Sequence, residues 1–174
     1  NIRLEKRKIV NDKEIYFDIF IFSEDKMIPI EVKYKTRKLT AIVDVGEYRE
    51  KYKLKDQLAS PLARYDFVKD ISRIEGFRKS GFAIFLTNDK LYWKYNTNKK
   101  VIDDEFKIHE NKEISGTLGW EQGAAPWTIK GSENPIKLHY NYTMYWKDYS
   151  DVQYFSLSNN PNTQFRYVLI EAQK

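Results

Sequence analysis

The chain has 174 residues, of which 41% are hydrophobic and 32% charged, a composition typical of a single folded domain rather than of a disordered segment. It contains no cysteine, which excludes disulfide frameworks and thiolate zinc sites and favours a cytoplasmic location. The formal charge of +5 and the pI near 9.1 suit a polyanionic partner. No apolar run approaches the roughly 20 residues of a membrane helix, so no membrane partner is expected.

The N-terminal part predicts an antiparallel meander of three strands. Residues 2–10 (IRLEKRKIV) are expected to form an edge strand, and residues 14–22 (EIYFDIFIF) a second strand. A turn with the sequence SEDK leads to a third strand over residues 27–35 (MIPIEVKYK). The short turn predicts that the second and third strands pair directly.

The third strand carries a carboxylate and an ammonium group within an otherwise apolar pattern. Ile28, Ile30 and Val32 alternate with polar or constrained residues. Because successive side chains of a strand point to opposite faces, Glu31 and Lys33 should share one face, with the apolar side chains behind them.

A helix should follow a mixed, basic segment over residues 36–58, which we interpret as a connection. Ser60 is the expected N-cap and Pro61 the first helical residue, and Gly81 provides a stop. Apolar residues recur between them at helical intervals, with a spacing that predicts a broad buried stripe: Leu62, Tyr65, Val68, Ile71 and Ile74.

The apolar run FAIFL at residues 82–86 predicts a strand buried on both faces, and residues 91–95 (LYWKY) are expected to pair with it. The later sequence is rich in aromatic residues, and residues 138–146 and 165–172 are strand-like. We therefore expect one domain over residues 1–174, with an α/β core at 2–95 and a β-rich C-terminal extension at 96–174.

Two carboxylates interrupt the apolar strands. Asp18 and Glu31 would be costly among such neighbours unless they are paired, hydrogen-bonded or bound to a metal. A meander can bring them together at one end of the sheet, where their oxygens would suit Mg²⁺. An ammonium at Lys33 could then position or deprotonate a water and balance charge on a phosphate. The alternative is an exposed Glu31–Lys33 ion pair, with Asp18 capping a turn.

The spacing of these residues resembles the core signature of the PD-(D/E)XK nuclease superfamily, the restriction-endonuclease-like fold. Asp18 is followed, after twelve residues, by Glu31-Val32-Lys33, and Phe17 occupies the position that often holds proline in that family. The resemblance covers about residues 2–95. It implies a central mixed β-sheet flanked by helix and a metal-dependent nuclease that hydrolyses phosphodiester bonds, with DNA as the expected substrate and restriction or defence as the expected setting.

The resemblance also implies roles for individual residues. Asp18 and Glu31 would bind Mg²⁺, for which Mn²⁺ could substitute, and the carbonyl group of Val32 could assist. Lys33 would be catalytic.

Basic residues run out of the third strand and are interleaved with aromatic ones, as in a groove that follows a phosphate backbone. The expected nucleic-acid contacts begin with Lys35, Arg37 and Lys38. We call the wider set the basic strip, which comprises these three residues and Arg49, Lys51, Lys53 and Lys55. Gln57 could orient a phosphate or water, and Arg64 could contact the backbone. A solvated charged face is the alternative interpretation of the basic strip.

Two other functions fit the same sequence. One is a non-catalytic nucleic-acid-binding module on the same fold, and the other is a β-rich interaction protein that uses its aromatic C-terminal part. A homodimer is compatible with each of these functions.

Overall fold

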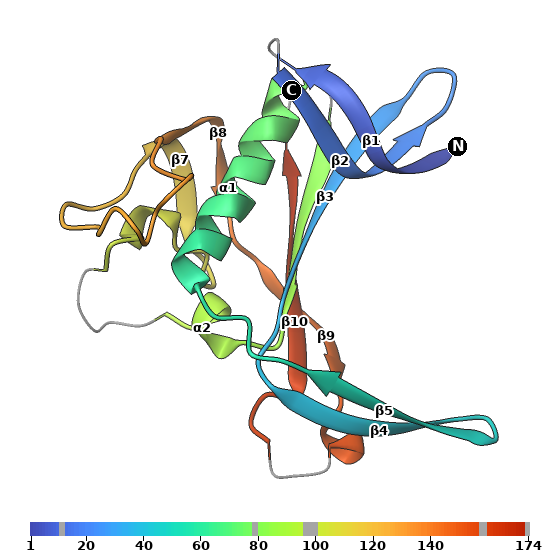
Figure 1. Ribbon diagram of the computed structural model, residues 1–174. Helices are drawn as coiled ribbons and strands as arrows, with labels where there is room; N and C mark the ends of the chain where they lie inside the picture. Colours follow the sequence, from blue (N-terminus) through green and yellow to red (C-terminus); the bar gives the residue numbers. More distant parts are fainter. Residues whose placement is uncertain (11–12, 78–79, 96–100, 157–159, 173–174) are drawn as a thin grey trace.

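The structure, a computed structural model, describes residues 1–10, 13–77, 80–95, 101–156 and 160–172 (Figure 1). Six strands form one mixed sheet in the order β1-β2-β3-β6-β10-β9. They are β1 (Ile2–Val10), β2 (Lys13–Phe22), β3 (Met27–Lys35), β6 (Gly81–Thr87), β10 (Gln164–Ala172) and β9 (Trp146–Asp151). No helix in the described ranges is long and apolar enough to cross a membrane.

The predicted meander is confirmed, and the sheet is of the mixed α/β type. Strands β1, β2 and β3 pair antiparallel, whereas β3 and β6 pair parallel. A parallel pair requires a crossover connection, which here contains the helix α1 (Ser60–Gly76). Strands β10 and β9 of the C-terminal part complete the sheet beyond β6.

The segment 36–58 is more than the connection that the sequence suggested. It contains the antiparallel strands β4 (Leu39–Val45) and β5 (Tyr48–Leu54), which project from the body of the molecule as a two-stranded ribbon (Figure 1). Gly46 adopts a φ of 62° in the tight turn between them, a conformation that glycine reaches without strain. Charged side chains at solvent-exposed positions of these strands obscured the alternation of apolar and polar residues by which a strand is normally recognised.

Helix α1 begins and ends slightly before the predicted positions. Ser60 is its first residue rather than its N-cap, and it ends at Gly76 rather than near Gly81. The predicted broad stripe is confirmed, because most of its apolar members are buried: Tyr65, Val68, Ile71 and Ile74.

Gly81 serves close packing rather than helix termination. A Cβ atom at this position would lie 2.6 Å from the carbonyl oxygen of Pro29 on β3 and 2.7 Å from Cγ2 of Ile74 on α1. Only a residue without a side chain allows the start of β6 to approach both elements so closely.

Helix α1 covers one face of the sheet, and no helix of the described ranges lies on the other face (Figure 1). On β6, Ala83 and Phe85 are buried against the helix side, whereas Phe82, Ile84 and Leu86 are only half-buried. The prediction that β6 is buried on both faces is therefore wrong for this part of the chain, because the described residues form only one covering layer.

The segment 91–95 does not pair with β6. It contributes to the short helix α2 (Lys90–Trp93), and β10 occupies the position beside β6. The carboxylate of Asp89 accepts a hydrogen bond from the backbone N–H of Leu91 at 3.0 Å and so caps the helix. The remaining elements are β7 (Glu113–Leu118), β8 (Ile136–Thr143) and the 3₁₀ turns η1 (Asp104–Phe106) and η2 (Gln153–Phe155).

Candidate active site

Asp18 and Glu31 meet where the pairing of β2 with β3 ends. The regular register extends from Phe22–Met27 to Ile19–Ile30. Beyond it, the backbone N–H of Val32 donates to Oδ2 of Asp18 at 2.7 Å, and the N–H of Asp18 donates to Oε2 of Glu31 at 3.4 Å. Side-chain carboxylates thus replace backbone carbonyls as acceptors, and this brings the two acids together as the sequence predicted.

Glu31 and Lys33 share one face of β3, and that face is the covered one. Glu31 is 3% exposed and the side chain of Lys33 is 25% exposed, whereas Val32 on the opposite face is 37% exposed. A half-buried strand usually turns its apolar face to the core. Here the charged face lies against α1, so its charges require partners from the helix.

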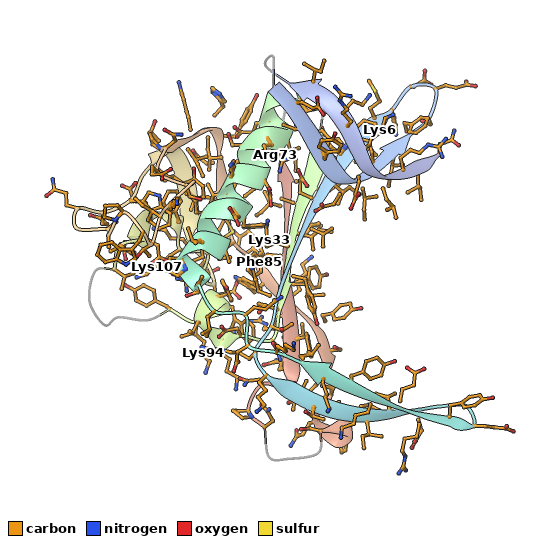
Figure 2. The ribbon with its side chains drawn as sticks, viewed as in Figure 1. Lys6, Lys33, Arg73, Phe85, Lys94 and Lys107 are labelled. Carbon is orange, nitrogen blue, oxygen red and sulfur yellow. The ribbon has the colours of Figure 1, made fainter. Side chains whose placement is uncertain are left out.

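Helix α1 supplies these partners through Asp70 and Arg73. The ammonium group of Lys33 lies 3.2 Å from Oδ2 of Asp70, and Nη1 of Arg73 lies 3.1 Å from both Oε1 of Glu31 and Oδ1 of Asp70. Arg73 also donates from Nη2 to the carbonyl oxygen of Tyr16 on β2 at 2.8 Å. Figure 2 shows Lys33 and Arg73 along the junction of the helix and the sheet. We call Asp18, Glu31, Lys33, Asp70 and Arg73 the charged network.

The charged network contains three carboxylates and two cations, and burial within it perturbs Glu31 most. Burial and, to a smaller extent, the nearby charge of Asp70 raise the pKa of Glu31 to about 8, against the opposing effect of Arg73. Burial also raises the pKa of Asp70, while Lys33 and Arg73 oppose the shift. Oε1 of Glu31 is buried and accepts no hydrogen bond from the described residues, although Arg73 lies within ion-pairing distance. An additional cation beside Glu31 would therefore be stabilised.

The donor atoms suit a hard divalent cation. Mg²⁺ typically binds through one or two protein carboxylates and retains several waters. Asp18 and Glu31 would supply these carboxylates, beside the backbone of Val32, whose N–H already donates to Asp18. Within the described residues no group of three or more His, Cys, Asp or Glu side chains is arranged to hold a metal.

Asp70 and Arg73 were not predicted from the sequence as site residues. They lie three residues apart on α1, and Asp70 is buried among the apolar residues of the stripe. A buried acid within an apolar helix face is a detectable signal, but it becomes informative only when the rotation of the helix against β3 is known. The apolar pattern alone allowed several rotations, because the stripe is broad.

The residues predicted to bind nucleic acid lie partly together, where β3 leads into β4 and β5 leads into α1. Lys35 and Lys38 have no ion-pair partner in the described part of the chain. Arg37 instead lies 3.0 Å from Asp89 and is 30% exposed. The side chain of Gln57 accepts a hydrogen bond from the N–H of Thr36 at 3.0 Å, so it holds the two chain segments together.

Arg64 lies apart from this group, on the first half of α1. Its Nη1 is 2.6 Å from Oδ2 of Asp103, and its Nη2 donates to the carbonyl oxygen of Leu91 at 2.7 Å. The guanidinium group is therefore largely engaged inside the protein and lines a separate cavity with Asp103 and Leu91.

Comparisons with known proteins add no relative. No family model matches the chain, and no curated protein or solved structure gave a significant match.

Proposed function

We propose that this protein is a metal-dependent nuclease that hydrolyses phosphodiester bonds in DNA, with restriction or defence as its setting. The observation that carries the proposal is the meeting of Asp18 and Glu31 at the end of the β2–β3 ladder, with Lys33 on the same face. The mixed sheet flanked by a helix agrees with the PD-(D/E)XK resemblance at the level of fold class.

Asp18 and Glu31, with the carbonyl group of Val32, would hold Mg²⁺, and Mn²⁺ could substitute for it. The chemistry that such an ion supplies is Lewis-acid activation of a water and neutralisation of charge on the phosphate. Lys33 would orient the attacking water and stabilise the charge that develops on the phosphate oxygens. Asp70 lies 3.2 Å from the ammonium group of Lys33 and acts as a positioning residue.

The basic strip would hold the DNA backbone. Lys51 and Lys53 lie on one face of the β4–β5 ribbon, opposite Ile42 and Thr40, and both are exposed. Two-stranded ribbons can follow a groove of duplex DNA, and lysine side chains bind its phosphates. Lys35 and Lys38 would extend this contact toward the charged network.

One observation favours a second candidate, a non-catalytic nucleic-acid-binding module. Arg73 lies within ion-pairing distance of both Glu31 and Asp70, as it would in a purely structural network. In that case the charges would fix α1 on β3, and the basic strip alone would provide function.

Incubation of supercoiled plasmid with the purified protein tests the proposal. We expect nicking or linearisation with Mg²⁺ or Mn²⁺ and none with EDTA. Asp18→Asn should be inactive at equal concentration, and Asp25→Asn, an exposed acid in the β2–β3 turn, serves as the matched control with parental activity. Plasmid retardation without cleavage under every metal condition would favour the binding module.

A further inference from the structure

A second site is suggested by a cavity of about 700 Å³ at the N-terminal end of α1. Its walls come from α1, α2 and residues 101–109. This volume is within the range of about 300–1,000 Å³ typical of small-molecule sites. None of the charged network lines the cavity. Arg64, one of its lining residues on α1, precedes Asp70 by about 9 Å along the helix axis, from a rise of about 1.5 Å per residue.

Two buried polar atoms of the lining have no hydrogen-bond partner in the described ranges. They are the hydroxyl oxygen of Tyr92 and Nε of Arg64. Tyr92 is 1% exposed, and the guanidinium carbon of Arg64 lies 5.2 Å from the centre of its ring. Buried polar groups are almost always satisfied in folded proteins, so the expected partner is a water or a ligand atom that a small movement of the lining would admit.

The lining is strongly cationic. It includes Arg64, Lys90, Lys94 and Lys107 but only one carboxylate, that of Asp103. Arg64 is paired with Asp103, and Lys107 lies 2.6 Å from Asp104. Lys90 and Lys94 form no ion pair within the described part of the chain. Figure 2 shows Lys94 and Lys107 beside the N-terminal end of α1. The excess of positive charge favours an anionic ligand.

The cavity also presents apolar and aromatic surface. Leu91 and Val101 are 46% and 38% exposed, and Tyr95 is 66% exposed. The ring of Tyr95 contacts that of His109 edge-on, with a centroid separation of 4.7 Å. Exposed apolar and aromatic side chains of this kind stack well on a flat ring. The ligand should therefore combine a flat ring with an anionic group.

We propose that this cavity binds a nucleotide. Lys90 and Lys94 would bind its phosphate, and the base would lie against Tyr95 and the apolar wall. Once a small movement of the lining admits the ligand, the buried hydroxyl group of Tyr92 would hydrogen-bond to the sugar or base. The same chemistry is offered by a free nucleotide and by the terminal nucleotide of a single strand. The inference does not depend on the proposed nuclease activity, since the two sites share no residue.

Binding of adenosine 5′-monophosphate in EDTA, measured by calorimetry on the full chain, tests the proposal without any cleavage. We expect one saturable site per chain, with an affinity at least about tenfold higher than that of adenosine or inorganic phosphate. The double variant Lys90→Gln/Lys94→Gln should weaken binding of the nucleotide about tenfold or more and leave adenosine unaffected. Lys137→Gln, an exposed lysine on β8, is the matched control and should bind as the parent does.

Tyr92→Phe provides a more conservative variant, because it removes only the unpartnered hydroxyl group. It should fold normally and weaken nucleotide binding severalfold. Displacement of the nucleotide by a 5′-phosphorylated oligonucleotide at lower concentration would identify a strand end as the ligand, and binding of the mononucleotide alone would identify a free nucleotide. Absence of saturable nucleotide binding, or equal affinity in parent and double variant, would overturn the proposal.

Discussion

The charged network and the basic strip lie on neighbouring stretches of the chain. They differ in whether their charged side chains are buried beside partners or exposed to solvent. In the charged network, Glu31 and Asp70 are buried and lie within 3.1–3.2 Å of cationic groups from β3 and α1. In the basic strip, Arg37 and Arg49 pair with acidic residues, whereas Lys51 and Lys53 are exposed on a projecting ribbon and have no ion-pair partner in the described residues. Buried charges depend strongly on each partner, whereas exposed charges are screened and act additively.

This difference indicates separate roles. Changes in the charged network should affect metal binding and the chemical step by large factors. Changes in the basic strip should alter affinity for DNA by modest factors that depend on salt. Variants in each region should therefore separate these two kinds of effect.

The largest effect is expected from Glu31→Gln, which keeps the size of the side chain but removes a metal-binding charge. Cleavage of plasmid DNA should fall below detection, while binding of the same DNA in Ca²⁺ should remain within about threefold of the parent, because the basic strip is intact. A gel-shift titration beside the cleavage assay measures both. Parental cleavage by this variant would remove Glu31 from the site.

Lys33→Ala should slow cleavage by about 10²- to 10⁴-fold, the range usual for a positioned proton-transfer group. DNA binding should not change. Single-turnover cleavage at saturating protein isolates the chemical step. Asp70→Asn tests the positioning of Lys33 and should give a smaller loss. If Lys33→Ala cleaves at the parental rate, the ammonium group has only a structural role.

The raised pKa of Glu31 predicts how stability depends on pH without metal. The folded protein retains the proton up to about pH 8, whereas an unfolded glutamate releases it near the ordinary pKa of 4.5. The folded state therefore binds more protons within this window, and the free energy of unfolding should decrease as pH rises, by at most about 1.4 kcal/mol per pH unit.

Urea unfolding at three pH values within this window, in EDTA, measures this slope. Glu31→Gln mimics the protonated side chain and should remove most of the decrease. Asp70, whose pKa is also raised, should account for a remaining decrease in the same direction. Equal slopes in parent and variant would show that Glu31 ionises normally.

The smallest effect is expected from the basic strip. Lys51→Gln and Lys53→Gln should each weaken DNA binding modestly and reduce the slope of log affinity against log salt by about 0.9 for each phosphate that the variant no longer binds. Arg37→Gln should instead lower stability, because Arg37 is paired with Asp89. Fluorescence anisotropy at several salt concentrations tests the lysines, and an unchanged slope would place the DNA-binding surface elsewhere.

The sequence predicted the centre of the charged network because strand periodicity and a short turn are local properties. They placed Asp18, Glu31 and Lys33 together without knowledge of the rest of the fold. Asp70 and Arg73 depend on how α1 rotates against β3, which is decided by packing between elements distant in sequence. The sequence also could not show which face of β3 is buried, because the packing of α1 against the charged face decides this.

Other elements were missed for different physical reasons. The β4–β5 ribbon carries charges on exposed positions, so its alternation was weak although Gly46 marked the turn. Helix α2 contains Tyr92 and Trp93, which favour strands, and the Asp89 cap with surrounding packing overrides that propensity. The strand-like stretches 138–146 and 165–172 correspond largely to β8 and β10, whereas β7 and most of β9 were not predicted. The place of β10 beside β6 is a tertiary property.

Calorimetric titration of Mn²⁺ into the parent protein, Glu31→Gln and Lys33→Ala most directly tests whether the charged network is a metal site. We expect one site in the parent, loss of that site in Glu31→Gln, and retention of it in Lys33→Ala, which removes no metal-binding oxygen. Proton release should accompany binding to the parent at neutral pH, because the metal displaces the proton that Glu31 otherwise retains. Absence of binding to the parent, or equal binding to Glu31→Gln, would contradict the metal-dependent nuclease.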